Sequence, residues 1–98
     1  MSIRSFRNKG TEDIALLRNS KQARKLLPAS LHEQANLRLL KLDAAVKLED
    51  IRLFPSYCLE KLKGNRKGQY SIRINDQYRI CFLWEAPNAF EVEIVDYH

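Results

Sequence analysis

The sequence predicts an α+β domain, with an N-terminal strand and helices packed on one face of a small, mainly antiparallel sheet. Two patterns support this class. Before residue 50, apolar residues recur at spacings of three and four, which is typical of helices that bury one face. From residue 59 onward, apolar and polar residues alternate in short segments separated by turn residues, which is typical of strands. Helices followed by strands within 98 residues predict a single domain over residues 1–98.

The charge of the chain narrows its possible partners. Its 17 lysines and arginines outnumber its 12 acidic residues, so the net charge is +5 and the isoelectric point is about 9.4. Such an excess favours a polyanion or an acidic protein as the partner. No apolar run approaches the roughly 20 residues of a membrane helix, so no membrane association is expected.

Cysteine and histidine usage predicts neither a metal nor another cofactor. Cys58 and Cys81 lack the CxxC spacing of metal sites, and His32 and His98 do not complete a ligand pair. The polar start of the chain is unlike an export signal, and two cysteines do not make a disulfide framework. A cytoplasmic location is therefore expected.

The first part of the chain predicts one short strand and two short helices. Residues 2–6 alternate in polarity and are expected to form an edge strand. Residues 8–18 carry acids before their apolar residues, with Thr11 placed to cap them, so a helix is expected there. Helical character resumes over residues 21–27, and Pro28 interrupts it.

A longer helix is expected after this proline. Ser30 and Glu33 match the capping box, in which the two side chains satisfy backbone N–H groups at a helix start. A helix of about four turns should follow, with one apolar stripe made by Leu31, Ala35, Leu39, Leu42 and Val46. Residues 48–57 are expected to be irregular, because Pro55 acts as a breaker there.

Strands dominate the rest of the chain. Four are expected, at residues 59–62, 69–74, 77–84 and 90–97. Turns are expected at 75–76 and 86–88, where Asn-Asp and Ala-Pro-Asn occur. Alternation assigns to the core face Tyr70, Ile72, Ile74, Ile80, Phe82, Phe90, Val92 and Ile94. The opposite face is open and carries Arg73, Arg79 and Tyr97.

The two arginines of this open face suit a phosphate group. A guanidinium presents a planar fork of N–H donors that matches phosphate oxygens two at a time. Arg79 lies between core residues of its strand, so it is poorly placed to be a mere solubilising group. The alternative for Arg79 is a cross-strand ion pair with Glu91 or Glu93, and Arg73 has a similar alternative.

Two further sets of residues belong to this surface or its rim. Tyr97 can stack on a nucleobase or donate its hydroxyl, and His98 titrates near neutral pH, which suits a general acid or base. Asp96 points inward or lies at the sheet edge, where it could orient Tyr97 or His98, or cap a backbone group. A basic run forms either a solvated loop or an anion-binding rim, and it consists of Lys61, Lys63, Arg66 and Lys67.

Three stretches of the sequence resemble the HigB-type toxins of the RelE superfamily, which belong to type II toxin–antitoxin pairs. They are IRSFRNKG near the start, LEKLKGNRKGQYSIRINDQYRICFLWE in the middle and VEIVDYH at the end, so the resemblance covers essentially the whole chain. It implies a RelE-like fold and a ribosome-dependent, metal-independent mRNA endonuclease that acts in the ribosomal A site and inhibits translation. In that chemistry the 2′-hydroxyl of the RNA attacks the adjacent phosphate, leaving a 2′,3′-cyclic phosphate and a free 5′-hydroxyl.

The resemblance also implies roles for individual residues. Arg79 matches the arginine that stabilises the phosphate, while Arg73 and Lys63 match basic positions around the catalytic site. The terminal catalytic trio of the family corresponds to Asp96, Tyr97 and His98. The other basic residues of the run are expected to bind RNA, and they are Lys61, Arg66 and Lys67.

Partners and alternatives complete these expectations. The resemblance implies three partners: the ribosome with its mRNA, a helix-turn-helix antitoxin of the HigA kind, and operator DNA bound only through that antitoxin. The sequence departs from the family pattern at Tyr57, Cys58 and Leu83, where family members often carry histidine or arginine. Two alternatives therefore stay open. One is a non-enzymatic inhibitor of the gyrase-poison type with the same fold, and the other is a catalytically weakened module that only binds antitoxin or RNA.

Overall fold

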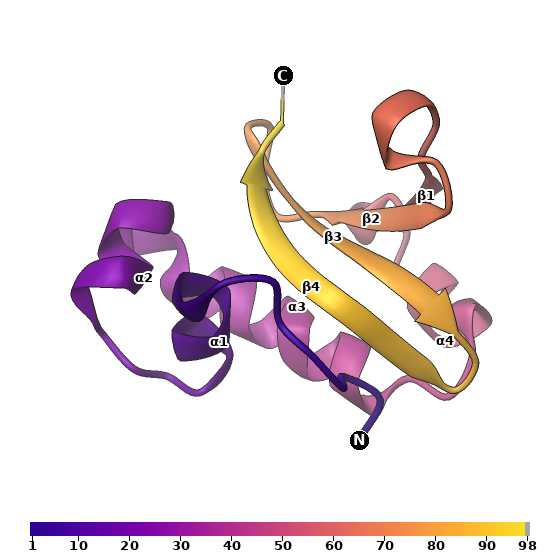
Figure 1. The fold of residues 1–98 in the computed structure, drawn as a ribbon, viewed down its shortest axis with the longest axis horizontal. Helices are drawn as coiled ribbons and strands as arrows, with labels where there is room; N and C mark the ends of the chain where they lie inside the picture. Colours follow the sequence, from indigo (N-terminus) through magenta and orange to yellow (C-terminus); the bar gives the residue numbers. More distant parts are fainter. Residues whose placement is uncertain (98) are drawn as a thin grey trace.

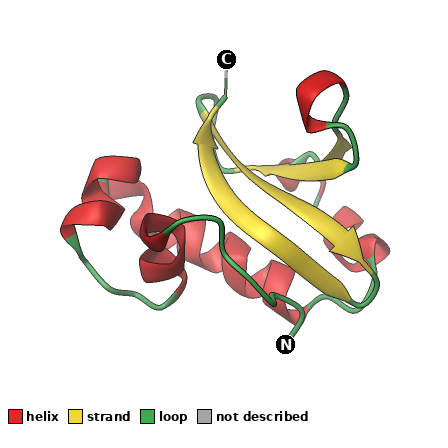
Figure 2. Ribbon diagram, in the orientation of Figure 1, coloured by secondary structure: helices red, strands yellow, loops and turns green. Residues whose placement is uncertain are grey.

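The computed structural model describes residues 1–97 and confirms the α+β class. The four described strands form one antiparallel sheet in chain order: β1 (Glu60–Lys61), β2 (Gln69–Arg73), β3 (Tyr78–Glu85) and β4 (Asn88–Asp96). The helices are α1 (Lys9–Ala15), α2 (Lys21–Leu26), α3 (His32–Ala44) and α4 (Leu48–Arg52). The 3-10 turns are η1 (Ala29–Leu31), η2 (Pro55–Tyr57) and η3 (Gly64–Arg66). In Figure 1, α3 and α4 pass behind the sheet, and Figure 2 shows the same view coloured by secondary structure.

The first helix begins before its predicted cap. The side chain of Asn8 is the N-cap of α1 and accepts a hydrogen bond from the backbone N–H of Thr11, with 2.9 Å between N and O. The prediction that Thr11 caps this helix is wrong. Thr11 is fully buried, and its Oγ1 accepts a hydrogen bond of 3.0 Å from the backbone N–H of Ile94. Because Ile94 belongs to β4, this bond fastens α1 to the sheet.

The long helix α3 begins without the predicted capping box. Its N-cap is Leu31, which makes no side-chain cap hydrogen bond, and Ser30 lies inside η1. The prediction fails because η1 runs directly into α3, so Ser30 is not at the helix start. The predicted apolar stripe is buried at Ala35, Leu39 and Leu42. Val46 lies beyond the end of the helix and is 65% exposed.

Residues 48–57 are regular, contrary to expectation, because they contain α4 and η2. The carboxylate of Asp50 accepts hydrogen bonds from the backbone N–H groups of Val46 (2.8 Å) and Lys47 (3.1 Å), and so satisfies donors at the start of α4. These two bonds lower the pKa of Asp50. Pro55 opens η2 at a position where a proline costs no hydrogen bond.

A β-bulge in β4 changes the predicted alternation. Cys81 pairs with Glu93, and Leu83 pairs with Phe90. Between these two pairs the chain advances two residues on β3 but three residues on β4, so β4 contains one extra residue. The extra residue lies near Glu91, whose φ of 51° is left-handed. Paired residues share a face of the sheet, so Phe90 lies with Leu83 on the open face. The prediction that Phe90 joins the core face is therefore wrong.

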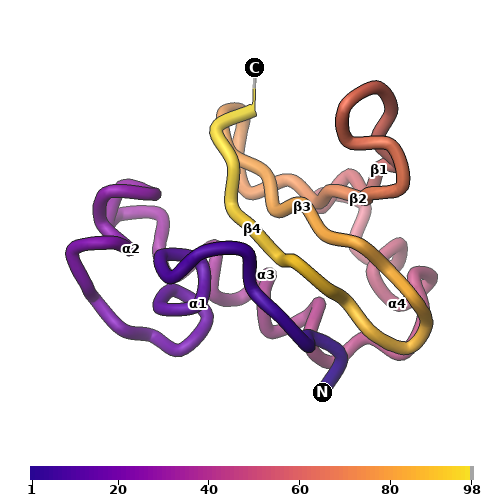
Figure 3. The backbone as a smooth tube through the Cα atoms, in the orientation of Figure 1, coloured from indigo at the N-terminus to yellow at the C-terminus, as the bar shows by residue number. Residues whose placement is uncertain are grey.

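The N-terminal segment lies alongside β4 in the parallel direction (Figure 3). Two isolated bridges, Ile3 with Ala89 and Phe6 with Val92, replace the continuous edge strand expected over residues 2–6. The backbone N–H of residue 4 donates to the carbonyl of Ala89 at 2.8 Å, and that of residue 7 donates to the carbonyl of Val92 at 3.0 Å. The segment therefore covers the outer edge of β4.

One hydrophobic core joins the helices to the covered face of the sheet. The largest fully buried side chain is Phe82 of β3, and its ring lies 6.2 Å from that of Tyr70 and 6.5 Å from that of Trp84. Around it pack the buried residues Ile14, Leu39, Leu42, Ile51, Ile72, Ile80, Val92 and Ile94. None of the helices within residues 1–97 has the length and apolarity needed to cross a membrane.

Candidate active site on the open face of the sheet

Arg79 is held at the open face by groups from three other segments. Its Nε donates to the Oγ of Ser71 at 2.8 Å, and its Nη2 donates to the backbone carbonyl of Cys58 at 2.6 Å. The guanidinium carbon lies 5.6 Å from the ring centroid of Tyr97, within the range of a cation–π contact. The alternative of an ion pair with Glu91 or Glu93 is not what the structure shows, because neither carboxylate lies within ion-pair distance of Arg79.

Arg73 lies directly opposite Arg79 in the pairing of β2 with β3. Like charges in such cross-strand positions repel, and here the acid Asp76 offsets the repulsion. Nη2 of Arg73 forms an ion pair with the carboxylate of Asp76, three residues away at the turn after β2. The backbone carbonyl of Arg73 also accepts a hydrogen bond of 2.7 Å from Nε of Arg38, on α3. Arg73 and Arg79 are therefore brought together, with Arg73 already paired to an acid.

The end of β4 brings Tyr97 to the same face. The backbone N–H of Tyr97 donates to the carbonyl of Gln77 at 2.7 Å, and the side chain is 38% exposed. Asp96 pairs with Tyr78 and so belongs to the other face of the strand, where its Oδ2 accepts a hydrogen bond of 3.1 Å from Nε2 of Gln77. His98, predicted as part of the trio, lies outside the described residues.

The lysines of the basic run lie on the arm formed by β1 and η3, which projects from the sheet beside β2 (Figure 1). Lys61, Lys63 and Lys67 are all exposed and line a shallow pocket together with Leu62 and Gly64. Lys61 pairs with Tyr70, which is on the core face, so its side chain starts from the face opposite to Arg79. The structure therefore keeps the three lysines together on the arm.

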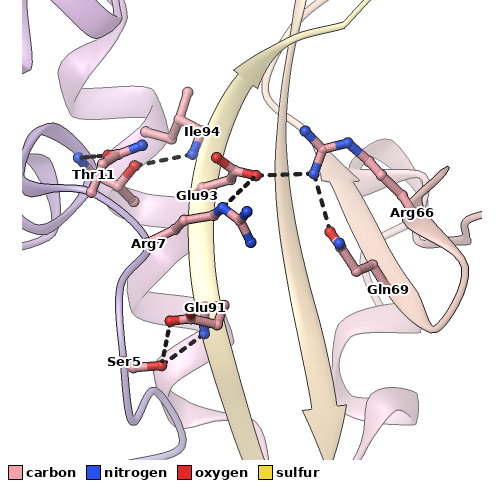
Figure 4. A network of polar contacts seen from close by, with 9 residues as sticks. Ser5, Arg7, Thr11, Arg66, Gln69, Glu91, Glu93 and Ile94 are labelled. Carbon is pink, nitrogen blue, oxygen red and sulfur yellow. Dashed lines mark hydrogen bonds and ion pairs between the residues drawn. The ribbon is translucent and has the colours of Figure 1, made fainter.

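Arg66 differs from these lysines because it folds back over the sheet (Figure 4). Its Nη1 donates to Oε1 of Glu93 at 2.9 Å and to Oε1 of Gln69 at 3.2 Å. The hydrogen bond with Glu93 raises the pKa of Arg66. Glu93 also lies 3.8 Å from Nε of Arg7, and its side chain is only 15% exposed. Beneath this network the buried thiol of Cys81 has a raised pKa, because burial disfavours its thiolate.

Sequence reasoning missed the groups that hold Arg79. Ser71 is fully buried on the open-face side of β2. It precedes Arg73 by two residues, so the period of the strand could have placed it on the same face as Arg73. The carbonyl of Cys58 left no signal, since any residue has a carbonyl and only the backbone conformation aims it. Within residues 1–97 no cluster of three or more histidine, cysteine or acidic side chains could hold a metal ion. The assembled groups are two arginines from paired positions of β2 and β3 and the phenol of Tyr97, all on the open face of the sheet.

The chain is similar to two curated toxins and one solved toxin structure. Toxin HigB-1 of Vibrio cholerae is 43% identical over 60 residues, which are 61% of this chain and 63% of that protein. Endoribonuclease HigB of Proteus vulgaris is 31% identical over 96 residues, which are 98% of this chain and 99% of that protein. A solved YoeB/ParE toxin from Agrobacterium tumefaciens has a TM-score of 0.49 at 17% identity, over 100% of this chain and 99% of that one.

The family assignment comes from a match along nearly the whole sequence. A family model described as the RelE-like toxin of the type II toxin–antitoxin system HigB matches residues 4–98. That range contains every described residue of the open-face site. A type II system pairs its toxin with an antitoxin, so an antitoxin partner follows from membership. The chain belongs to the HigB family of RelE-like toxins of type II toxin–antitoxin systems.

Proposed function

We propose that this chain is a ribosome-dependent mRNA endonuclease that needs no metal and uses the 2′-hydroxyl of the RNA as its nucleophile. The observation that carries the proposal is Arg79, a cation held beside Tyr97 on an open sheet face. The name of the Proteus vulgaris relative, Endoribonuclease HigB, supports the same reaction class. The family membership supports a role as the toxin of a type II toxin–antitoxin system.

The proposed reaction is an internal transfer of the phosphate. The 2′-oxygen forms a bond to the adjacent phosphorus, and the bond from that phosphorus to the 5′-oxygen of the next nucleotide breaks. The proton of the 2′-hydroxyl passes to a general base, and the departing 5′-oxygen takes a proton from a general acid. Extra negative charge develops on the phosphate in the transition state, where a positioned guanidinium stabilises it by about 2–4 kcal/mol.

The proposed roles follow from which groups can move protons. Arg79 stabilises the phosphate and cannot be the base, because an arginine stays protonated. Arg73 supplies a second cation across the strand pair. The acid and the base are to be found among Lys63, Asp96, Tyr97 and His98. Lys61, Arg66 and Lys67 bind the RNA backbone, which makes binding dependent on salt.

The proposed setting is the A site of a translating ribosome in the cytoplasm. There the toxin inhibits translation, and a helix-turn-helix antitoxin of the HigA kind neutralises it. Operator DNA is bound only through that antitoxin. The net charge of +5 supports a partner rich in phosphate, such as ribosomal RNA and mRNA.

The test is expression from an inducible promoter in a bacterial host, with the wild-type chain beside Arg79→Ala. The wild type should arrest growth and produce discrete cuts within codons, seen as new 5′ ends in mapped mRNA. Arg79→Ala should relieve both effects, whereas the matched control Arg52→Ala, at an exposed position of α4, should not. DNA damage without mRNA cuts would instead indicate the gyrase-poison alternative. Ribosome or antitoxin binding without growth arrest would indicate the weakened binding module.

A further inference from the structure

We propose that the hydroxyl of Ser71 and the backbone carbonyl of Cys58 are positioning groups that aim Arg79 at the RNA linkage. This inference rests on the proposed function and deepens it. Each group acts through Arg79 and is not itself in contact with RNA. The three residues come from separate parts of the chain, namely the residue after η2, β2 and β3, so only the folded sheet brings them together.

The two hydrogen bonds occupy one edge of the guanidinium. Nε of Arg79 donates to Ser71 Oγ at 2.8 Å, and Nη2 donates to the carbonyl oxygen of Cys58 at 2.6 Å. A guanidinium is planar, and its Nε–H and one Nη2–H bond point to the same side. The edge formed by Nη1 and Nη2 therefore faces away from both acceptors. That edge has the spacing to bind two oxygens of one phosphate.

Ser71 is a rigid acceptor because it is enclosed by the sheet. It is fully buried, and it pairs with Glu60 on one side and with Cys81 on the other. Solvent does not reach it, so water cannot readily replace its hydroxyl if the side chain is removed. A guanidinium that is already fixed loses less conformational entropy when a phosphate binds. The burial of Ser71 thus favours an Arg79 that is oriented before RNA arrives.

The carbonyl of Cys58 is aimed by an unusual backbone conformation. Cys58 has φ of 49° and ψ of 52°, which is left-handed, and its N–H donates to the carbonyl of Pro55 at 3.1 Å. The preceding Tyr57 is anchored, since its ring stacks on Phe54 at 5.0 Å and lies 4.7 Å from the guanidinium of Arg38. The side chain at position 58 therefore affects the direction of this carbonyl mainly by how well it tolerates the left-handed conformation.

That tolerance allows a matched pair of substitutions at one position. Asparagine adopts left-handed backbone readily, whereas a β-branched residue such as valine does so rarely. Cys58→Val should turn the carbonyl away from Arg79, and Cys58→Asn should keep it in place. At Ser71 the informative change is Ser71→Ala, and its matched control is Ser56→Ala, which removes an exposed hydroxyl from η2.

The first measurement is the cleavage rate of mRNA on translating ribosomes, for each variant alone and combined with Arg79→Lys. Ser71→Ala should lower kcat/KM about tenfold, the size expected for losing one hydrogen bond to a charged group. Cys58→Val should lower kcat/KM about tenfold more than Cys58→Asn does. Both losses should largely vanish in the Arg79→Lys background, because lysine cannot use either acceptor in the same way. Equal losses in both backgrounds, or no loss at all, would overturn the inference.

The second measurement does not depend on catalysis. NMR should show slow solvent exchange of the Arg79 Nε–H in the wild type and in Ser56→Ala, and fast exchange in Ser71→Ala. Fast exchange in the wild type would overturn the inference whether or not the protein cuts RNA. Slow exchange in a protein that cuts no RNA would leave the geometry intact and reject the proposed function. Cleavage at the full rate by Ser71→Ala would reject the positioning role and leave the proposed function standing.

Discussion

Arg66 and Glu93 join the lysine-bearing arm to the last strand of the sheet. The Nη1 of Arg66 lies 2.9 Å from Oε1 of Glu93, across 27 positions of sequence, while Nε of Arg7 lies 3.8 Å from the same oxygen. The side chain of Arg66 is 35% exposed and that of Arg7 is 57% exposed. Solvent screens a shorter and less exposed ion pair less. The pair of Arg66 with Glu93 should therefore contribute more to the free energy of unfolding than the pair of Arg7 with Glu93.

This difference can be measured with two double-mutant cycles on the free energy of unfolding. The coupling between Arg66→Ala and Glu93→Gln should be about 1 kcal/mol, and that between Arg7→Ala and Glu93→Gln about 0.3 kcal/mol. Urea denaturation of the single and double variants gives both values. Equal couplings for the two arginines would mean that distance and burial do not decide the strength of this network.

The hydroxyl of Thr11 should stabilise the fold through one buried hydrogen bond. Thr11→Val keeps the shape but leaves the backbone N–H of Ile94 without its acceptor, and should cost about 1–3 kcal/mol of unfolding free energy. Hydrogen exchange of the Ile94 amide should become faster in Thr11→Val. In the control Thr11→Ser, which retains the hydroxyl, the amide should stay protected. Unchanged protection in Thr11→Val would contradict the assigned bond.

The two neighbours Phe82 and Leu83 should differ sharply in their effect on stability. Phe82 is fully buried in the core, so Phe82→Ala should cost about 3–5 kcal/mol. Leu83 points to the open face and is partly exposed, so Leu83→Ala should cost less than about 1 kcal/mol. Denaturant unfolding of both variants tests the facing of β3. Similar losses at the two positions would mean that the strand is turned differently.

Asp13 should make stability depend on pH in the acid range. A 2.6 Å hydrogen bond from Ser20 is the largest cause that lowers the pKa of Asp13, and Lys9 and Arg18 add to it despite the burial of the carboxylate. A lowered folded-state pKa stabilises the fold above the unfolded pKa of about 3.9, and this contribution is lost as pH falls through the folded value.

Unfolding of Asp13→Asn beside the wild type, at several pH values, tests this expectation. The wild type should be the more stable at pH 7, and the difference should shrink below about pH 4. Glu12→Gln is the matched control, because Glu12 is more exposed and lies 3.7 Å from Lys9. A stability difference for Asp13→Asn that stays constant from pH 7 to pH 3 would show that its ionisation is not linked to folding.

Tyr97 offers a prediction about the proposed reaction itself. Tyr97→Phe keeps the ring against Arg79 and removes only the hydroxyl, so kcat should fall about a hundredfold while KM stays near the wild-type value. Tyr97→Ala also removes the ring and should raise KM as well. Single-turnover cleavage on ribosomes separates the two effects. A Tyr97→Phe variant with full activity would exclude the hydroxyl as acid or base.

Alternation predicted most of the sheet because a half-buried strand has a strict period of two residues. Ile72, Ile80 and Ile94 are buried as expected, and Arg73 and Arg79 share the open face. The bulge at Glu91 could not be predicted, since a glutamate is not a residue that usually marks a left-handed position.

The prediction that Thr11 caps its helix failed because the hydroxyl that could cap the helix makes a hydrogen bond to a distant segment instead. The hydroxyl of Thr11 serves a strand 83 positions away instead of its own helix. His32, at the start of α3, directs Nε2 at the carbonyls of Ala23 and Leu27, at 3.1 and 2.7 Å, and so also makes contacts away from its own helix. In the candidate site, Arg79 and Tyr97 could be paired from alternation, but the acceptors that hold Arg79 depend on tertiary packing that no local pattern encodes.

The parallel pairing of the N-terminal segment with β4 constrains when the fold can form during synthesis. Ser5 and Glu91, which share a hydrogen bond, are 86 positions apart, so the segment emerges from the ribosome long before its partner strand exists. Until then the emerging chain cannot form the pairing between the N-terminal segment and β4, or the contact between Arg79 and Tyr97. The contact between Arg79 and Tyr97 therefore forms only after β4 has been synthesised.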